Sequence, residues 1–420
     1  MKVLVVGGGA REHAICWKLE QSTKVSKVYC APGNAGISQV AECVNINVDD
    51  LKGLTRFAVS ENIDLAVIGP EGPLVGGLAD MLEEMDIKVF GPCKKASRLE
   101  GSKSYSKDFM KKYNIPTARY ESYTDPQKAK EGLKHFKVPV VVKADGLAAG
   151  KGVLICNTGK EAEEAIDSIM NERQFGSAGD KIVIEEFLEG TEASLLCFAD
   201  GKSLIPMESA RDYKKAYDND QGLNTGGMGS FSPNMIYTDE LQNYIDESII
   251  KPTQSGLEAE GIDFRGVLYF GLMISKGEAK VLEYNVRFGD PETEAVLPRL
   301  KSDLAEIMLK CIDGELTEKD LQWENEKCVT VVLASGGYPQ NYEKCKEITG
   351  LNHVDRDVVI FHGASKIHGN KTVTDGGRVL AVTAKGKTLE QAREKIYNTI
   401  AEIHFDNMEF RTDIARLVSY

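Results

Sequence analysis

The sequence of 420 residues lacks the features of several protein classes. It has no apolar run near the roughly 18 residues that span a bilayer, so we expect no membrane partner. Its first residues run from a short apolar stretch straight into glycines, without the cleavage-site pattern of a signal peptide. Acidic residues outnumber basic ones by 64 to 51, the opposite of the balance typical of nucleic-acid binders. We therefore expect a cytoplasmic protein that binds no nucleic acid.

Paired cysteines and histidines are also absent. The nine cysteines are odd in number and scattered, no CxxC pair occurs, and the six histidines form no HExxH motif. These counts disfavour both a zinc cluster and a disulfide framework. Buried free thiols in a reducing compartment are the simpler interpretation.

Glycine is present in excess, at 40 of 420 residues, about 9.5% against a usual ~7%. The length predicts two or three domains of about 150 residues each. Over residues 1–101, short apolar runs alternate with helical patterns, which predicts a parallel sheet covered on both faces. Segment 102–325 contains a lid at about 123–190 and then a hairpin of longer strands that turns at 276–277. Segment 326–420 predicts a third, smaller unit.

Three consecutive glycines, Gly7, Gly8 and Gly9, follow the first predicted strand and precede a helix. Such a turn exposes free backbone N–H groups and the positive end of the helix to an anion. The dinucleotide fingerprint GxGxxG is incomplete, because Glu12 stands in place of the third glycine and the second strand ends without an acidic residue. The pattern favours phosphate binding, with a plain tight turn and NAD(P) binding as the alternatives.

A second glycine cluster, Gly146, Gly150 and Gly152, lies between two apolar, β-branched strands. It differs from the P-loop, since the first two glycines are one residue too close and Gly152 replaces the Ser or Thr that would hold magnesium. A glycine-rich hairpin tip can fold over phosphates while Lys143 and Lys151 supply positive charge. The alternative is an ordinary exposed hairpin.

Polar residues alternate along the last strand of the predicted hairpin. Glu283, Asn285 and Arg287 should share one face, and Leu282 and Tyr284 the other. Carboxylate and amide oxygens suit magnesium, and an arginine beside them can neutralise a transferring phosphoryl group. A solvated outer face fits less well, because the preceding strand is apolar on both sides.

Two segments carry weaker signals. Strand 182–188 ends in Glu185 and Glu186, followed by Glu192, which suits an adenine and ribose site, although many edge strands end in glutamates. The loop 224–229 holds three glycines, whose entropic cost suggests close approach to a ligand. A plain mobile loop is the alternative there.

Together these motifs resemble the ATP-grasp superfamily, and their order and detail resemble its phosphoribosylamine–glycine ligase family, the glycinamide ribonucleotide synthetases. The matching stretches run from VVGGGAREHA to GGRVLAVTA and include KADGLAAGKG, NTGGMG and RFGDPETE. The resemblance implies an α/β fold: a parallel-sheet N-terminal domain for phosphoribosylamine, ATP-grasp central domains with a mobile lid, and a small α+β C-terminal domain. It implies a ligase of de novo purine biosynthesis that uses ATP and Mg²⁺ or Mn²⁺. The product would be glycinamide ribonucleotide, formed with ADP and phosphate through a glycyl phosphate.

The resemblance also implies roles for individual residues. Those implied for ATP are Lys103, Lys143, Gly146, Gly150, Lys151, Gly152, Glu185, Glu186, Phe187, Leu188 and Glu192, and those for the metal are Glu283 and Asn285. Those implied for the other substrates are Gly7, Gly8, Gly9, Glu12, Gly33, Asn34, Gly69, Pro70, Glu71, Lys214, Asn224, Gly226, Gly227, Met228, Asp290, Pro291 and Glu292. Catalysis would fall to Arg287, Lys143, Lys151 and Asp212.

The chain departs from the family pattern in places. Tyr213 stands where histidine is frequent, Leu223 where proline is frequent and Glu294 where glutamine is frequent, and the usual glycine after Ile414 is missing. The expected partners are small molecules bound by a monomer, with weak contacts to neighbouring purine-pathway enzymes. The alternatives are another ATP-grasp carboxylate–amine ligase or carboxylase, a nicotinamide-dependent dehydrogenase and a nucleotide sensor.

Overall fold

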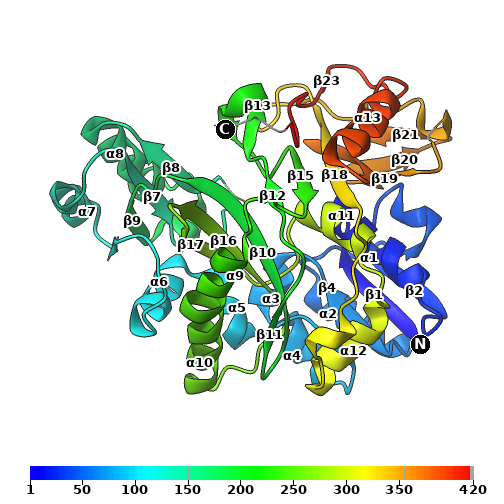
Figure 1. The fold of residues 1–420 in the computed structure, drawn as a ribbon, viewed down its shortest axis with the longest axis horizontal. Helices are drawn as coiled ribbons and strands as arrows, with labels where there is room; N and C mark the ends of the chain where they lie inside the picture. Colours follow the sequence, from blue (N-terminus) through cyan, green and yellow to red (C-terminus); the bar gives the residue numbers. More distant parts are fainter. Residues whose placement is uncertain (149–150, 354, 417–420) are drawn as a thin grey trace.

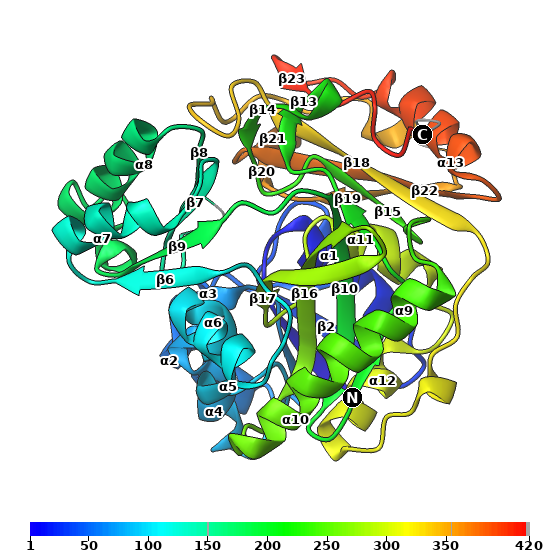
Figure 2. The same ribbon diagram turned by 60° about the vertical axis from the view of Figure 1, so that its left-hand side comes forward.

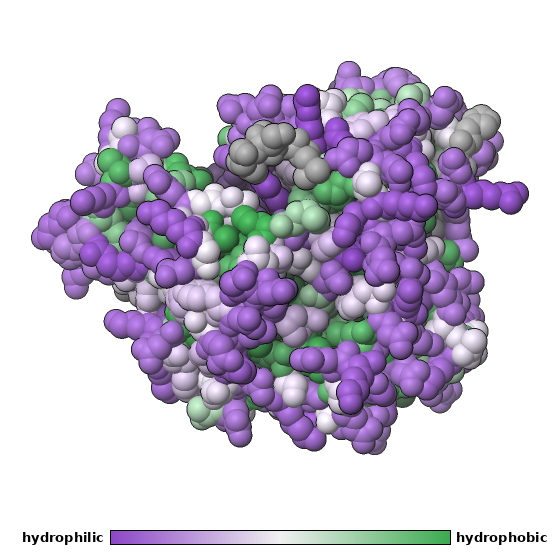
Figure 3. All heavy atoms as spheres, viewed as in Figure 1, coloured by the Kyte–Doolittle hydropathy of each residue, from purple (hydrophilic) through white to green (hydrophobic). Residues whose placement is uncertain are grey.

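The described residues form four larger β-sheets, two small two-stranded sheets (β13-β14 and β20-β21) and the helices packed on them (Figure 1). The fold is seen in a computed structural model that describes residues 1–148, 151–353 and 355–416. In Figure 2 the lid lobe lies at the upper left, helices α4 to α6 lie below it, and the C-terminal sheet lies at the upper right. Hydrophilic side chains cover most of the face in Figure 3, and hydrophobic ones gather in the hollow beside the lid lobe.

The N-terminal unit is a five-stranded parallel sheet in the order β3-β2-β1-β4-β5. Leu4 and Val6 of β1 pack into one hydrophobic core, whereas Val3 and Val5 pack into another. Both faces of the sheet are thus covered, which confirms the predicted parallel α/β unit. Its elements are β1 (Lys2–Gly7), α1 (Ala10–Glu20), β2 (Lys27–Pro32), β3 (Glu42–Cys43), α2 (Leu51–Ser60), β4 (Leu65–Ile68), α3 (Glu71–Gly76), α4 (Leu78–Glu83), β5 (Lys88–Phe90) and α5 (Lys94–Gly101).

The lid is an antiparallel sheet in the order β6-β9-β7-β8, with a small core of its own. Helix α6 (Lys103–Lys112) leads into it. The glycine-rich segment joins β7 to β8, where Lys143 pairs with Val153, so the predicted hairpin is confirmed. The elements of the lid are β6 (Tyr120–Tyr123), α7 (Pro126–Gly132), β7 (Val140–Ala144), β8 (Val153–Cys156), α8 (Gly159–Ile166) and β9 (Ile182–Glu186).

The central sheet, in the order β11-β10-β16-β17, carries one wall of the site. Its strands β16 and β17 form the predicted hairpin that turns at 276–277. The elements of this unit are β10 (Thr191–Asp200), β11 (Leu204–Pro206), α9 (Asp239–Ile245), α10 (Lys251–Ala259), β16 (Arg265–Ser275), β17 (Glu278–Asn285), α11 (Glu292–Val296) and α12 (Leu304–Asp313).

A β-bulge interrupts the alternation of β17. Gly271 pairs with Glu283 while the next residue, Leu272, pairs with Val281, so Leu282 is the extra residue. Val281 and Tyr284 are buried in the core, whereas Leu282 is half-buried like the neighbouring Glu283. The prediction that Leu282 shares a face with Tyr284 is therefore wrong, because strict alternation does not survive a bulge.

The C-terminal sheet has the order β12-β15-β18-β22-β19, with β23 paired to β18. Strands β12 and β15 come from residues 211–232, so part of the middle segment completes the sheet of the last one. The division at 1–101, 102–325 and 326–420 stays a prediction. The elements here are β12 (Arg211–Asp212), β13 (Lys215–Tyr217), β14 (Gln221–Asn224), β15 (Gly229–Ser232), β18 (Lys327–Ser335), β19 (Val358–His362), β20 (Ser365–His368), β21 (Lys371–Thr374), β22 (Arg378–Gly386), α13 (Leu389–Ile400) and β23 (Met408–Glu409).

Even the long helix α13 has only 12 residues. Within residues 1–148, 151–353 and 355–416, no helix is long and apolar enough to cross a membrane.

Candidate active site

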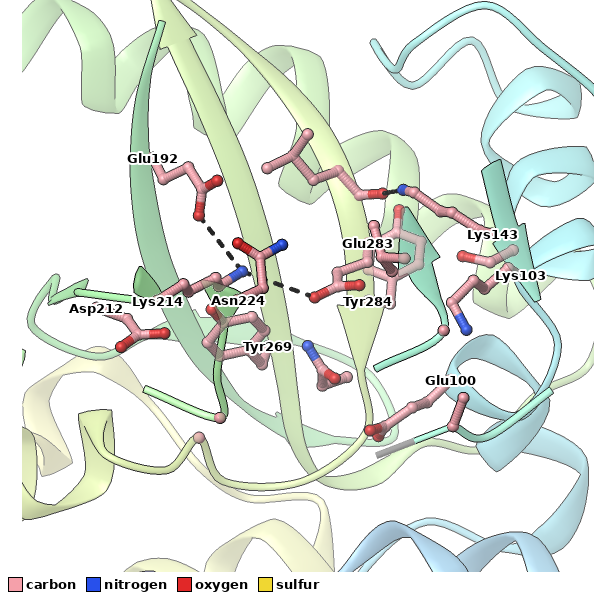
Figure 4. A pocket seen from close by; sticks show the side chains of 18 of the residues that line it. Glu100, Lys103, Lys143, Glu192, Asp212, Lys214, Asn224, Tyr269, Glu283 and Tyr284 are labelled. Carbon is pink, nitrogen blue, oxygen red and sulfur yellow. Dashed lines mark hydrogen bonds and ion pairs between the residues drawn. The ribbon is translucent and has the colours of Figure 1, made fainter. Parts of the chain in front are cut away.

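A cavity of about 520 Å³ lies where the lid, the central sheet and parts of the N- and C-terminal units meet (Figure 4). Most of the residues predicted for a site line it together. These are Pro70, Glu71, Lys103, Lys143, Gly152, Glu185, Glu186, Phe187, Leu188, Glu192, Asp212, Lys214, Asn224, Gly226, Glu283, Asn285, Arg287, Asp290 and Glu292.

One end of the cavity is rich in lysine. Lys107 and Lys143 approach the two carboxylate oxygens of Glu185 at 2.9 and 3.0 Å, and all three side chains are buried. Burial raises the pKa of Glu185, but the two lysines lower it by more than burial raises it. The pKa of Glu185 therefore lies below its ordinary value. Burial lowers the pKa of Lys107 to about 8. Glu185, predicted for the nucleotide base, therefore also sets the position of Lys143.

The third lysine of this end holds the glycine-rich hairpin. Lys103, at the start of α6, donates from Nζ to the carbonyl of Gly146 at 3.1 Å, and its backbone N–H donates to the carbonyl of Asp145. Asp145 in turn accepts hydrogen bonds from Ser102 and from the backbone of Ser104. We call Lys103, Lys107, Lys143 and Glu185 the cationic end. Three lysines against one carboxylate leave a net positive charge at this end, which suits a polyanion such as a nucleotide.

Glu283 and Asn285 of β17 both line the cavity, and Figure 4 shows Glu283 in its middle. Burial raises the pKa of Glu283, but Lys214, Lys143, Lys103 and Arg287 together bring it below the ordinary value, so its carboxylate is ionised. One carboxylate and one amide oxygen fit a divalent cation that keeps water and phosphate as its other ligands. In the described part of the chain, no three His, Cys, Asp or Glu side chains form a metal cluster.

Arg287 connects the central strand to the N-terminal unit. Its Nε donates to Glu71 at 3.2 Å, its Nη1 donates to the carbonyl of Phe288, and its Nη2 lies 2.9 Å from Glu100 and donates to Asn285 at 3.2 Å. All three nitrogens are thus already engaged within the protein. This arrangement orients Asn285 and leaves Arg287 little capacity to bind a substrate directly.

The opposite end of the cavity is rich in carboxylates. Ser194 and Tyr269 donate to Glu292 at 2.8 and 3.0 Å, and the Oδ1 atom of Asp212 is buried without a hydrogen-bond partner among the described residues. Burial and the neighbouring Glu292 raise the pKa of Asp212 well above its ordinary value. We call Asp212, Glu292, Tyr269 and Ser194 the acidic end.

Lys214 lies between Glu192 and Glu283 in the cavity (Figure 4). Its Nζ lies 3.4 Å from Glu192 and 3.9 Å from Glu283. Glu192 raises the pKa of Lys214 well above the ordinary value, so this lysine is charged. Lys214 is therefore a cation between the carboxylate predicted to bind metal and the one predicted to bind ribose.

The N-terminal glycine turn is built differently from the predicted open phosphate loop. Glu12 accepts a hydrogen bond from the backbone N–H of Gly9 at 2.7 Å and pairs with Arg11 at 2.7 Å. Asn34 donates to the carbonyls of Gly8 and His362, which ties this turn to the C-terminal unit. The polar groups of Glu12 and Asn34 thus bind the protein itself, and their role in substrate binding stays a prediction.

The remaining predicted residues do not line the cavity. Those placed elsewhere are Gly7, Gly8, Gly9, Glu12, Gly33, Asn34, Gly69, Gly146, Lys151, Gly227, Met228 and Pro291. Lys151 is exposed. Gly150 lies outside the described residues.

Eight polar residues of the cavity were not predicted as site residues. They are Arg11, Glu100, Lys107, Tyr269 and Arg378, together with Ser106, Thr225 and Tyr284. Arg11, Glu100 and Lys107 lie in or beside stretches that carry the family resemblance, so those stretches offered a signal. Tyr269 and Arg378 lie in such stretches too, GVLYFGLM and GGRVLAVTA, but each stands in an otherwise apolar strand, β16 or β22.

Models of the three domains of phosphoribosylglycinamide synthetase match this chain in order. The N domain matches residues 1–100, the ATP-grasp (A) domain matches 101–293 and the C domain matches 328–417. The chain belongs to the phosphoribosylglycinamide synthetase family. The resemblance seen in the sequence is confirmed, and with it the ATP-grasp fold class.

Relatives within the phosphoribosylglycinamide synthetase family match over almost the whole length. The phosphoribosylamine–glycine ligase of Caldanaerobacter subterraneus subsp. tengcongensis is 49% identical over 415 residues, which are 99% of each chain. That of Escherichia coli O6:H1 is 46% identical and covers 99% of this chain and 98% of its own. These relatives are ligases of the ATP-grasp type, which supports the predicted enzyme class.

Solved structures give the same assignment. The crystal structure of phosphoribosylamine–glycine ligase from Thermotoga maritima superposes with a TM-score of 0.86 at 36% identity, covering 99% of this chain and all of that one. The biotin carboxylase domain of Hydrogenobacter thermophilus 2-oxoglutarate carboxylase superposes with a TM-score of 0.73 at 18% identity, covering 97% and 91%. At that identity the second likeness concerns the fold alone.

Proposed function

We propose that the chain joins glycine to 5-phosphoribosylamine, with ATP as the energy source, to give glycinamide ribonucleotide, ADP and phosphate in purine biosynthesis. One observation carries the proposal: a single cavity holds a lysine-rich end, the Glu283–Asn285 pair and a carboxylate-rich end in succession. That order suits a phosphate donor, a divalent cation and an amino-group substrate. Full-length relatives with the matching name support it.

The chemistry requires an activated carboxylate, because direct attack by an amine on an anion would have to expel oxide. Transfer of the terminal phosphoryl group of ATP to the carboxylate oxygen of glycine gives glycyl phosphate and ADP. The amine of phosphoribosylamine then attacks the carbonyl carbon, the C–O bond to phosphate breaks, and the amine loses a proton. Catalysis of this kind depends on positioning and charge neutralisation.

The cationic end would hold the nucleotide. Lys103 and Lys143 would bind its phosphates, and Glu186 to Leu188 would line the base. The glycine-rich hairpin would cover the phosphates together with Lys151 and would exclude water, which protects the acyl phosphate from hydrolysis.

Glu283 and Asn285 would hold Mg²⁺, or Mn²⁺ in its place. A bound cation of this kind neutralises phosphate charge and orients the transferring group. Glu283 is suited to the task because nearby cations keep it ionised. Arg287 would act by orienting Asn285, to which it donates a hydrogen bond.

The phosphoribosylamine would lie between the N-terminal unit and the acidic end. Pro70 and Glu71 reach the cavity from the turn after β4 and the start of α3, and Asp290 and Glu292 reach it from the loop before α11 and the start of that helix. We further propose a monomer whose partners are these small molecules, with weak contacts to neighbouring purine-pathway enzymes.

The test is phosphate release from ATP and magnesium with glycine and freshly made phosphoribosylamine, omitting one component at a time. We expect release to require all four components and the product mass to equal that of glycinamide ribonucleotide. Repeating the assay with β-alanine in place of glycine tests whether the enzyme is specific for glycine. Phosphate release that ignores glycine would contradict the proposal.

A further inference from the structure

Arg378 is the first residue of β22 in the C-terminal sheet, yet its side chain lines the cavity. Its Nη1 nitrogen donates to the carbonyl of Gly226 at 2.7 Å and to the carbonyl of Asp290 at 3.0 Å. The same nitrogen lies 2.9 Å from the carboxylate of Asp290. One nitrogen therefore clamps two loops that the sequence predicts for substrate binding.

The other two nitrogens of Arg378 are not used in this way. No hydrogen-bond partner of Nε or Nη2 occurs among the described residues, and neither atom is among their buried unpartnered atoms. Arg287 differs, because each of its three nitrogens is engaged by the protein. Of these two arginines in the cavity, Arg378 is the one with a free pair of donors.

The backbone beside this free pair carries no side chain. A Cβ atom at Gly226 would lie 2.9 Å from Cζ of Arg378 and 3.0 Å from Nη2. Contacts below 3.0 Å are not tolerated by real Cβ atoms, so glycine at this position allows the guanidinium to lie where it does. Gly226 and Arg378 thus form one local arrangement built from segments 152 residues apart.

Arg378 also lies among acidic side chains. Burial lowers the pKa of its guanidinium, but Asp290 first, then Tyr338, Glu294 and Asp212, outweigh this and raise it, so the side chain is always charged. A substrate that carries an ammonium group next to its own carboxylate would match a cation surrounded by acids. Glycine has this pattern of charge, whereas a phosphate ester carries only the negative part.

We propose that the Nε–Nη2 edge of Arg378 binds a substrate oxyanion in a bidentate manner, with the carboxylate of glycine as the favoured ligand. Guanidinium presents two parallel donors that match the two oxygens of a carboxylate or a phosphate. The C-terminal unit thereby supplies a binding residue for the reaction and does not only support the fold. This inference rests on the proposed function.

The experiment compares wild type with Arg378→Lys and Arg378→Ala in steady-state assays, with KM measured for glycine, phosphoribosylamine and ATP in turn. We expect the KM for glycine to rise at least tenfold in both variants while the KM for ATP changes less than twofold. Lysine should not rescue, because it has no pair of parallel donors. Added methylguanidinium should partly restore the glycine KM of Arg378→Ala.

Arg393→Ala is the matched control, since this arginine lies on α13 of the same unit and does not line the cavity. It should leave all three KM values unchanged. A rise confined to the KM for phosphoribosylamine would support the oxyanion site and assign it to the phosphate instead. Unchanged KM values for both substrates, or equal losses for all three substrates without rescue, would overturn the inference.

Gly226→Ala provides a second variant that removes no charge. With Arg378 present, the new methyl group should displace the guanidinium and raise the glycine KM. In the Arg378→Ala background, the same substitution should raise the glycine KM little further. Additive effects of the two substitutions would contradict a shared site. The wild type decides the proposed function separately, because a wild type that does not turn over glycine refutes that function, whatever Arg378 does.

Discussion

Each end of the cavity contains a buried carboxyl group, but the pKa values of the two groups are shifted in opposite directions. At the cationic end Glu185 lies between two lysines and its pKa is lowered, whereas at the acidic end Asp212 lies near Glu292 and its pKa is raised. Both carboxyl groups are buried, so burial alone cannot explain the difference. Each also has two cations within reach, so the carboxylates Glu292 and Glu192 beside Asp212 account for its opposite shift. The comparison indicates that one end prepares a site for phosphates and the other a site for an amino group.

The strongest test of this division is Glu283→Gln, in the middle of the cavity. The substitution keeps the shape but removes the charge, so we expect turnover to fall about 100-fold or more through loss of phosphate neutralisation. The melting temperature should fall only slightly, because the pair with Lys214 is long, at 3.9 Å, and Glu283 is about one-third exposed. Normal turnover at low magnesium would show that Glu283 does not hold the metal.

Lys143→Met tests the cationic end, with Lys151→Met as the matched comparison. Lys143 is buried against Glu185, and breaking a buried ion pair costs roughly 3 kcal/mol of unfolding free energy. Lys151 is exposed, so its loss should leave stability unchanged. We expect both substitutions to weaken ATP binding, as measured by calorimetry. In urea denaturation, only Lys143→Met should lower the free energy of unfolding. Equal stability of the two variants would show that the Lys143–Glu185 pair is not a structural link.

Asp212→Asn tests the acidic end. The wild-type carboxyl keeps its proton until the pH exceeds its raised pKa, so it can accept a proton only on the alkaline side of that value. If Asp212 accepts the proton of the attacking amine, turnover in the wild type should rise with pH over this range. The asparagine variant should then lose about tenfold in kcat and show a flat profile. A variant that keeps the rising limb would assign that limb to another group.

Glu294→Gln should have the smallest effect and the opposite sign. Glu294 is fully buried, and neither of its carboxyl oxygens has a hydrogen-bond partner among the described residues. Burial and Asp290 raise its pKa well above the ordinary value. The native state therefore takes up a proton that the unfolded chain does not bind, and stability falls as the pH rises above the unfolded value near 4.3.

Glutamine removes this dependence because it is neutral at every pH. We expect the melting temperature of Glu294→Gln to exceed that of the wild type by roughly 2 °C or more at pH 8. The gap should close below about pH 4.5, where both chains are neutral at this position. A constant gap at all pH values would show that packing, and not the proton, causes the difference.

Much of this arrangement could be predicted from short stretches of sequence. The ends of β4 and β5, the β16–β17 hairpin and the hairpin between β7 and β8 all follow from apolar runs bounded by turn residues a few positions apart. The bulge at Leu282 could not be predicted, because it depends on how β17 pairs with β16. The hydrogen bonds of Glu12 and Asn34 could not be predicted either. Glu12 accepts from the backbone N–H of Gly9 at the start of α1, and Asn34 donates to the carbonyl of the distant His362.

The sequence by itself determined the family, the order of the units and the chemical character of the cationic end and of Glu283. These follow from short motifs, each of which can be read from a few neighbouring residues. Only the tertiary structure decided the state of Asp212, the engagement of Arg287 and the entry of Arg378 into the cavity. These depend on packing between segments up to 216 residues apart, where distance and burial set both charge and free hydrogen-bonding capacity.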